Sequence, residues 1–448
     1  MISLFRPVDR ALYGRIWKIA LPMMLAGVSE PLLGAVDTAV VGHLPDPKHL
    51  GAVAVGAMLF SYVFWAFGFL KMGTGGYVAQ AFGRGDGDEM RAIIGRAVLI
   101  AAVISVALIA LQRPILALAL PLMGAEPAVN DLTDLYFSIR IWSTPAALIQ
   151  YIVFGLLLGL QNARANLVVL LALNIGNILL DLLFVLVFDM GVAGVAWATV
   201  IASYLAAGLG IWLALRELAR HPGLWNRQGL LDMARHKELF QTNANIFIRT
   251  LLLVSCWALF TSIGARIGTD VLAANAVLAN FMAIMAYALD GFAHAAQAVS
   301  GSAWGARDRR LFEDSVRGAL QWSIIFALPI ALAYLVAGHF LVDLMTGIPA
   351  VREIAYGYLP WMALLTLVST WAFVYDGVFM GATRTRPLRD SAIICTAIYV
   401  AVIFTGTHFY GADAIWPSVI LLNILRGATL QLAWPKLLRA LPEKQTSS

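Results

Sequence analysis

Apolar runs of about 20 or more residues recur from one end of this chain to the other, and each is long enough to cross a bilayer as a helix. Of the 448 residues, 60% are hydrophobic and 13% are charged, about half the charged fraction of an average soluble protein. The first run is too long for the core of a signal peptide, so we expect it to be retained. The sequence therefore predicts an all-α integral membrane protein embedded in a lipid bilayer.

Twelve transmembrane helices are predicted. Their expected positions are residues 16–41, 51–80, 92–121, 134–160, 164–188, 191–215, 240–265, 272–300, 318–345, 352–382, 388–410 and 412–437. The longest polar stretch lies near the midpoint of the chain and separates two groups of six helices. We therefore expect an N-lobe at 1–215, a cytoplasmic linker at 216–239 and a C-lobe at 240–448.

The two halves resemble each other at one constant offset, which we call the repeat offset and which takes position 81 to position 303. The motif AFGRGD at 81–86 matches AWGARD at 303–308, and the same offset aligns LGAVAVGA at 50–57 with LAANAVLA at 272–279. Since each half has six spans and begins on the same side of the membrane, the repeats are parallel and predict two pseudo-symmetric six-helix bundles. This architecture is typical of secondary transporters that work by alternating access.

Basic residues are concentrated in alternate loops, whereas the loops on the opposite side contain few of them. By the positive-inside rule, both termini and the central loop lie in the cytoplasm. The net charge of +5 does not indicate a nucleic-acid partner, because the basic residues fall in short loops between spans.

Two acids lie inside apolar spans at a similar expected depth. Asp37 is in the first span and Asp181 in the fifth, with Thr199 at the same level in the sixth. The spacing of Asn174, Asn177 and Asp181 places them on one helix face. A carboxylate at membrane depth costs several kcal/mol unless a proton or a cation neutralises it. We therefore predict an ion-coupling site made of Asp37, Asn177, Asp181 and Thr199.

The ion bound at this site is either H⁺ or Na⁺. Two close carboxylates cannot both stay ionised without a cation, so one of them should take up a proton. The all-oxygen set of ligands also suits Na⁺. The alternative interpretation is that the Asn and Asp side chains only satisfy one another as contacts between helices.

A second polar level lies closer to the cytoplasm, with Arg249 in the seventh span, Asp290 in the eighth and Asp376 in the tenth. Because a cation is present, an internal ion pair of Arg249 with one of the acids is the simplest interpretation. A role in substrate entry or gating is the alternative. In the first span, Pro22 and Pro31 weaken the helical hydrogen-bond ladder and allow either bending or a static kink.

Several of these segments resemble the multidrug and toxic compound extrusion (MATE) transporters. The likeness rests on ALPMMLAGVSEPLLGAVDTAVVGHL, VAQAFGRGD, NIGNILLD and GVAGVAWATVIA, and YALDGFA and DGVFMGATR resemble the DNA-damage-inducible-F branch. It covers essentially the whole chain. The resemblance implies two six-helix lobes, a bacterial inner-membrane location, a monomer without a cofactor, and cation-driven export of amphipathic, often cationic, small molecules.

The resemblance also assigns roles to residues. The coupling residues of the family fall on Asp37, Asn177, Asp181 and Thr199, and the proline associated with bending of the first helix falls on Pro22. Members that bind Na⁺ in the carboxy-terminal lobe use an acid in span 7, where this chain has RTLLLVSCWALF, with Arg249 and no acid. This departure favours coupling to H⁺ in the N-lobe.

The leading hypothesis is thus an antiporter that exchanges H⁺, or alternatively Na⁺, for amphipathic compounds. The alternative function is a flippase for lipids or lipid-linked precursors, which would need a more strongly basic central cavity. We do not expect an enzyme, because the spans contain no HExxH or GxSxG motif that would supply metal ligands or a nucleophile.

Overall fold

The computed structural model describes residues 6–42, 46–123, 127–230 and 232–441, with the side chains at 30–35, 37, 38, 122, 123, 128 and 227 excepted. Within these residues every regular element is a helix. Ten helical stretches are long and apolar enough to cross a membrane, and one of them, 385–439, covers two helices. Together with α1 (Arg10–Gly42), they account for the predicted twelve spans and confirm the all-α membrane fold.

The helices form two compact units. The N-unit consists of residues 25–238, and the C-unit consists of residues 1–24 and 239–448. The expected domains instead placed the whole of 1–215 in one lobe. The structure differs at residues 1–24, because α1 begins in the C-unit and ends in the N-unit.

Aromatic packing explains why the start of α1 belongs to the C-unit. The Tyr13 hydroxyl donates to Gln321 Oε1 at 2.6 Å, and the Trp17 ring lies 5.2 Å from the ring of Trp322. Aromatic pairs at such distances contribute about 0.5–1.5 kcal/mol beyond the area that they bury. One continuous helix therefore joins the two units, and the buried Pro22 lies just before the boundary at residue 24.

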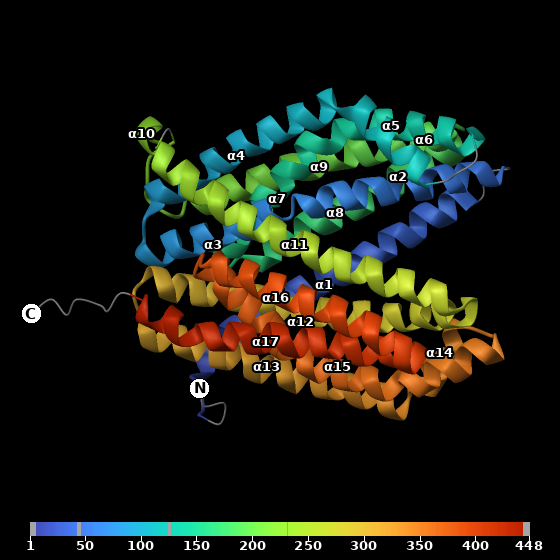
Figure 1. Cartoon of the computed structure of the whole chain (residues 1–448). Helices are drawn as coiled ribbons and strands as arrows, with labels where there is room; N and C mark the ends of the chain where they lie inside the picture. The colour runs from blue at the N-terminus through green and yellow to red at the C-terminus, as the bar shows by residue number, and fades with distance from the viewer. Residues whose placement is uncertain (1–5, 43–45, 124–126, 231, 442–448) are drawn as a thin grey trace, which may run out of the picture. The chain divides into compact units, whose positions relative to one another are not determined.

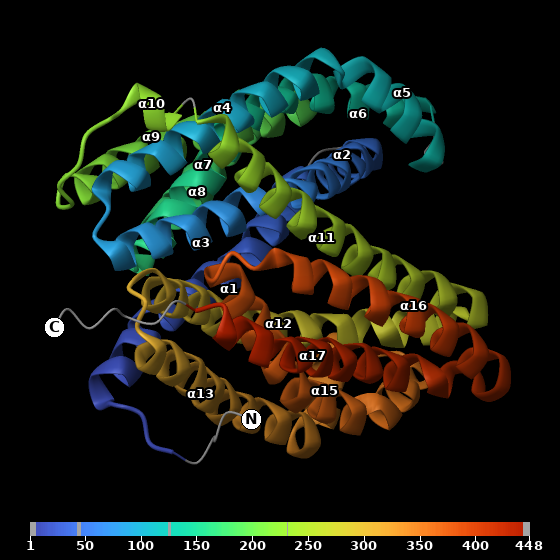
Figure 2. The ribbon, with the colours of Figure 1, turned by 60° about the vertical axis from the view of Figure 1, so that its left-hand side comes forward.

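In the N-unit, helices α3, α4, α7 and α9 pack against one another (Figures 1 and 2). The elements that follow α1 are α2 (Pro47–Ala66), α3 (Phe69–Arg84), α4 (Gly87–Ala110), α5 (Gln112–Met123), α6 (Pro127–Arg140), η1 (Ile141–Ser143), α7 (Thr144–Gly159), α8 (Ala163–Asp181), η2 (Leu182–Val187), α9 (Gly191–Leu218) and α10 (Arg227–Leu230). Where α2 meets α6, the buried rings of Phe60 and Phe137 stack at 4.7 Å.

In the C-unit, α12, α13, α15 and α17 form a packed bundle, and α16 lies along α17 (Figures 1 and 2). The elements are α11 (Met233–Ile267), α12 (Thr269–Gly305), α13 (Arg309–Val336), α14 (Gly338–Met345), α15 (Pro349–Gly381), α16 (Thr385–Tyr410), η3 (Gly411–Ala414) and α17 (Ile415–Arg439). Helix α11 passes from the N-unit to the C-unit between residues 238 and 239, so α1 and α11 both connect the units.

Some expected spans are interrupted in the N-unit. The span expected at 51–80 is divided between α2 and α3, where the Phe67 and Gly68 N–H groups bond to the Phe64 and Trp65 carbonyls. The corresponding helix of the C-unit, α12, is a single helix of 37 residues. Equivalent segments of the repeat therefore form two helices in the N-unit and one continuous helix in the C-unit.

The internal repeat is present in the local structure. Asp86 caps α4 by accepting from the Glu89 N–H at 3.0 Å. Asp308, its equivalent at the repeat offset, caps α13 by accepting from the Leu311 N–H at 2.9 Å. The residue before each cap lies in the left-handed region, with φ 71° in the N-unit and 57° in the C-unit. Equivalent caps and turns at equivalent positions confirm the internal repeat that the sequence predicts.

Close helix packing repeats at the same offset. A methyl group added at Gly155 on α7 would come within 2.6 Å of the Lys71 carbonyl oxygen on α3. At the equivalent Gly377 on α15, it would collide with the carbonyl oxygen of Ala293 on α12. Lys71 and Ala293 are themselves equivalent positions of the repeat. In each unit, therefore, a glycine lets the same pair of helices approach backbone to backbone.

Candidate functional site

Helix α8 buries three polar side chains on one face. Asn174, Asn177 and Asp181 are 6%, 2% and 0% exposed, whereas Ile175 and Leu179 on the opposite face are exposed. Asn177 Nδ2 donates to Asp181 Oδ2 at 2.8 Å. The predicted common face is therefore confirmed, and it brings an amide into contact with a carboxylate.

Asp181 lies at a change of helix type. It is the last residue of α8, and a π-helical segment, Leu182–Val187, continues the chain. The Phe188 N–H donates to the Leu183 carbonyl at 3.0 Å, which is an i to i−5 bond. Such π-helical turns inside helices are frequent at functional sites. This π-helical turn was not predicted from the sequence, because no residue type marks it.

Asn174 connects α8 to α1 within the N-unit. Its Nδ2 donates to the Ser29 carbonyl at 3.2 Å and to the Ser29 hydroxyl oxygen at 3.1 Å. The Ser29 hydroxyl donates in turn to the Ala26 carbonyl at 2.7 Å. The second half of α1 is therefore fixed to the helix that carries Asp181.

The other predicted coupling residues lie on the helices around α8. Thr199 is on α9, which packs along α8, and its hydroxyl donates to the Val195 carbonyl of its own helix at 3.0 Å. Asp37 is on α1, and its side chain lies outside the described residues. Among the side chains that the structure describes, no group of three or more His, Cys, Asp and Glu residues is placed to hold a metal ion.

In the C-unit, one carboxylate lies between two arginines. Arg249 on α11 and Arg426 on α17 both donate from Nη2 to Oδ2 of Asp376 on α15, and the Arg426 distance is 2.6 Å. The side chains of Arg249, Arg426 and Asp376 are 10%, 12% and 9% exposed. The predicted ion pair of Arg249 is thus confirmed with Asp376. Asp290, the other candidate acid, lies on α12 and is exposed.

Arg426 was not among the residues predicted from the sequence. An arginine in the middle of the apolar span expected at 412–437 was a visible signal, of the same kind that identified Arg249. Its presence changes the charge of the cluster, because two guanidinium groups share one carboxylate. Loss of Arg249 alone would therefore not leave Asp376 without a cation.

Neutral polar groups and one aromatic ring surround Arg426. Its Nη1 donates to Asn423 Oδ1 at 3.0 Å, and its guanidinium lies 5.7 Å from the centre of the Phe373 ring. One turn further along α17, the Thr429 hydroxyl is 2.6 Å from the Ser391 hydroxyl of α16. The cluster thus has an excess of donors over negative charge, and chemically it can bind an anion.

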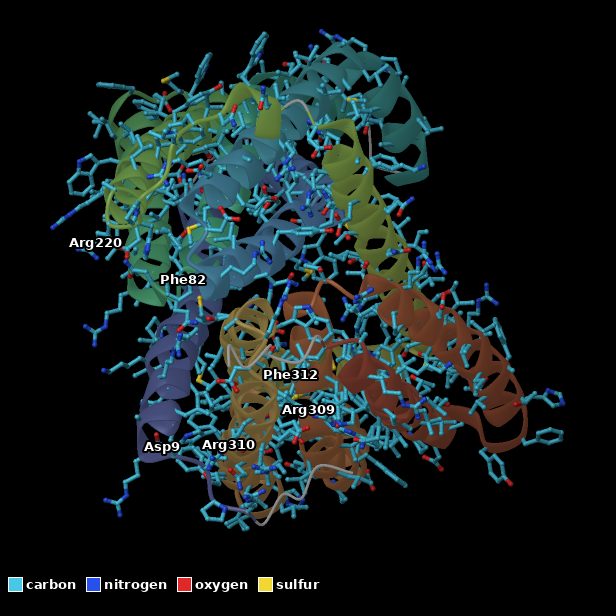
Figure 3. The ribbon with its side chains drawn as sticks, turned by 90° about the vertical axis from the view of Figure 1, so that its left-hand side faces the viewer. Asp9, Phe82, Arg220, Arg309, Arg310 and Phe312 are labelled. Atoms are coloured by element: carbon cyan, nitrogen blue, oxygen red, sulfur yellow. The ribbon has the colours of Figure 1, made fainter. Side chains whose placement is uncertain are left out.

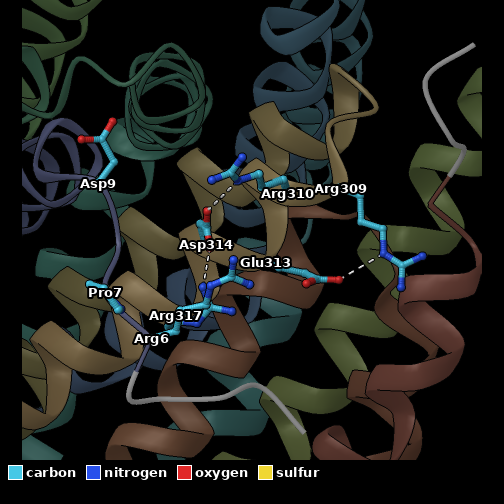
Figure 4. A pocket seen from close by; sticks show the side chains of 8 residues that line it. All are labelled: Arg6, Pro7, Asp9, Arg309, Arg310, Glu313, Asp314 and Arg317. Carbon is cyan, nitrogen blue, oxygen red and sulfur yellow. Dashed lines mark hydrogen bonds and ion pairs between the residues drawn. The ribbon is translucent and has the colours of Figure 1, made fainter. Parts of the chain in front are cut away.

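A third group of charged residues lies at one end of the C-unit, where Figure 3 labels Asp9, Arg309 and Arg310. They belong to an open pocket of about 500 Å³ that Figure 4 shows from close by. Arg309 Nε lies 3.1 Å from Glu313 Oε1 one turn along α13, a pairing typical of a solvated helix surface. Binding sites for apolar compounds are lined mainly by hydrophobic side chains, so this pocket does not fit such a role.

A family model described as MatE matches residues 22–183 and 246–405. The starts of the two matched segments differ by nearly the repeat offset. The first segment includes Asn174, Asn177 and Asp181. The second includes Arg249 and Asp376 and ends before Arg426.

Individual relatives match along nearly the whole chain. DNA damage-inducible protein F of Escherichia coli (strain K12) is 38% identical over 422 residues, covering 94% of this chain and 91% of that protein. Multidrug export protein MepA of Staphylococcus aureus (strain N315) is 19% identical over 403 residues, covering 90% and 89%. In structure, the MATE transporter VcmN of Vibrio cholerae superposes with a TM-score of 0.83 at 22% identity, covering 96% of this chain and 98% of that one.

Proposed function

The chain belongs to the MatE family of transporters, and from this premise we propose that it is a secondary active antiporter which exports amphipathic small molecules in exchange for protons. Membership in this family makes it a transporter and not an enzyme. The observation that carries the proposal of proton coupling is the buried hydrogen bond between Asn177 and Asp181.

A buried acid beside a neutral amide is suited to binding and releasing a proton. Asp181 is fully buried, and its Oδ2 accepts a hydrogen bond from the neutral amide of Asn177. Ionisation in such surroundings costs several kcal/mol, whereas a protonated carboxyl group keeps its hydrogen bond at little expense. Asp37 supplies a second acid to the same unit, as the sequence and the family resemblance imply. Proton uptake by this pair removes the charge.

Helix α1 could couple proton uptake to a change of conformation. Ser29 fixes its second half to α8 through Asn174, and Tyr13 and Trp17 fix its first half to the C-unit. Pro22 lies between these anchors, where the missing N–H weakens the helix. We infer that proton uptake favours bending of α1 at Pro22 and release of the exported compound. Proton and compound then favour different states of one protein, as exchange requires.

The location and partners follow from the same proposal. We place the chain as a monomer in a bacterial inner membrane with both termini in the cytoplasm, because basic loops alternate with loops that contain few cations. The substrates are amphipathic and, by analogy with a relative named as a multidrug export protein, varied in structure. Na⁺ is the alternative coupling ion, with Asp37, Asn177, Asp181 and Thr199 as its oxygen ligands.

A lipid flippase is the second candidate function. The observation that favours it is the pair of arginines on Asp376, since guanidinium groups are well suited to bind phosphate. This candidate shares the fold and differs in the exported compound, so transport measurements with both kinds of compound separate the two.

Transport in proteoliposomes tests the proposal. With an imposed pH gradient and no Na⁺ gradient, the wild-type chain should export a fluorescent amphipath, and Asp37→Asn and Asp181→Asn should each abolish gradient-driven export while remaining monodisperse. Asp290→Asn should reduce export less. The matched control is Asp134→Asn, which changes an exposed acid paired with Arg113 on the surface of the N-unit. Export by Asp181→Asn at the wild-type rate would place the coupling site elsewhere.

A further inference from the structure

The cluster of Arg249, Asp376 and Arg426 has more positive than negative charge. Both guanidinium groups donate to the same carboxylate oxygen, Asp376 Oδ2, so two cations share one anion. A single arginine would suffice to neutralise Asp376. The second one adds a net positive charge to side chains that are no more than 12% exposed. Burying an uncompensated charge is unfavourable, so a second anion would stabilise this arrangement.

Arg426 keeps N–H donors that its described hydrogen bonds do not use, and these could bind such an anion. Its side chain is 12% exposed, and its two described hydrogen bonds, to Asn423 and Asp376, use Nη1 and Nη2. A guanidinium group has five N–H donors in a planar fork, and the Nε–H remains in addition to the second hydrogens on each terminal nitrogen. Phe373 lies against the guanidinium and offers an apolar surface beside the charge.

We propose that Arg426 and Arg249 bind the anionic group of the exported compound, while Phe373 and its neighbours contact the apolar body. The substrate class is therefore amphipaths with a carboxylate, sulfonate or phosphate group, including zwitterions. This inference rests on the proposed transport function and narrows its substrate. Asp376 holds the two guanidinium groups in place and limits the net charge, so that the anion is bound and can still be released.

Equilibrium binding to the purified full-length chain in nanodiscs tests the proposal without any ion gradient. The probes are a dansyl-labelled alkyl sulfonate and its trimethylammonium counterpart of equal chain length. Two further arms use short-chain fluorescent phosphatidylglycerol and phosphatidylcholine, which distinguish a lipid phosphate from a non-lipid anion. The wild-type chain should bind the sulfonate at least ten-fold more tightly than the ammonium compound.

Two substitutions should change anion binding in opposite directions. Arg426→Gln should weaken sulfonate binding ten-fold or more and should not weaken binding of the ammonium compound, because it removes a positive charge that repels that probe. Asp376→Asn, which keeps an acceptor oxygen but removes the negative charge, should tighten sulfonate binding several-fold. If Arg426→Gln does not yield a monodisperse protein, Arg426→Lys keeps the charge without the fork and should weaken binding less. A purely structural cluster would give folded variants with unchanged anion affinity, or equal losses for both probes, and would overturn the proposal.

The outcome separates this inference from the transport proposal. Arg426-dependent anion binding in a protein that shows no proton-driven export would disprove antiport but retain the anion site. Proton-driven export of the ammonium compound that is unaffected by Arg426→Gln, with no anion selectivity in binding, would retain antiport and remove the anion site.

Discussion

The N-unit and the C-unit place different residues at equivalent positions of one helical framework. Helices α8 and α16 begin at equivalent positions, and at the repeat offset Asn177 and Asp181 of the N-unit correspond to Tyr399 and Ile403 of the C-unit. The Tyr399 hydroxyl donates to the Cys256 carbonyl at 3.4 Å, and Ile403 is fully buried. The C-unit thus fills with apolar packing the place where the N-unit holds its acid.

On the preceding helix of each unit, the C-unit has the acid and the N-unit has an apolar residue. Asp376 of α15 corresponds to Phe154 of α7, whose ring lies 4.5 Å from Lys71 Nζ. The N-unit therefore has a cation over an aromatic ring where the C-unit has an acid between two arginines. The helix caps and the close-packed glycines are shared, and the charged groups are not. This difference fits the proposal that the two units share a helical framework and that their charged groups serve different purposes.

The largest effect on stability is expected at Asp376. Asp376→Ala leaves two buried guanidinium groups without their shared carboxylate, and removing one partner of a buried ion pair costs about 3–5 kcal/mol. Asp181→Ala removes a hydrogen bond from a neutral amide and should cost about 1–3 kcal/mol. Unfolding in mixed micelles measures both.

The control for this comparison is Glu313→Ala, which breaks an exposed pair with Arg309 and should change the free energy of unfolding by less than about 1 kcal/mol. Should Asp376→Ala be no less stable than Glu313→Ala, the C-unit cluster would not be a buried charged group, and the contrast between the units would fail.

A smaller effect is expected where the units are alike. Gly155→Ala and Gly377→Ala should each destabilise the protein, typically by about 1–3 kcal/mol, because the added methyl group meets the backbone of a neighbouring helix. The loss should be larger for Gly377, where the carbonyl oxygen of Ala293 is closer. Gly357→Ala on the same helix has open space and should be neutral or stabilising, by up to about 1 kcal/mol.

Thermal unfolding of these three variants in detergent checks the prediction. A stable Gly377→Ala together with an unstable Gly155→Ala would show that the shared framework of the two units does not extend to the contact between α12 and α15.

Much of this framework could be predicted from the sequence because it depends on local patterns. The apolar runs predict the helices, and the motifs around Asp86 and Asp308 predict an internal repeat, with which the two helix caps agree. The polar face of α8 follows from its helical spacing, and Arg249 and Asp376 follow from the cost of charge inside apolar spans.

Other features depend on tertiary contacts that no local pattern reveals. The sequence does not show that the first half of α1 packs with the C-unit, because the aromatic partners of Trp17 lie in the other half of the chain. The π-helical turn after Asp181 is likewise set by packing rather than by residue type. Arg426 is a different case. The sequence shows an arginine inside an apolar span, but it does not show that this arginine pairs with Asp376 on another helix.

The smallest expected effect distinguishes the coupling ions in the N-unit. The Thr199 hydroxyl already donates to the Val195 carbonyl, so a proton shared by Asp37 and Asp181 does not need it. Thr199→Val keeps the shape of the side chain, and proton-driven export should stay within about two-fold of wild type, equivalent to roughly 0.4 kcal/mol. Na⁺ would use the hydroxyl oxygen as a ligand, and its loss would then lower export driven by a Na⁺ gradient ten-fold or more. Export rates of Thr199→Val and wild type under separate pH and Na⁺ gradients give the answer. A large loss confined to the Na⁺ gradient would make the N-unit cluster a sodium site, and the contrast with the C-unit would then be between a cation site and an anion site.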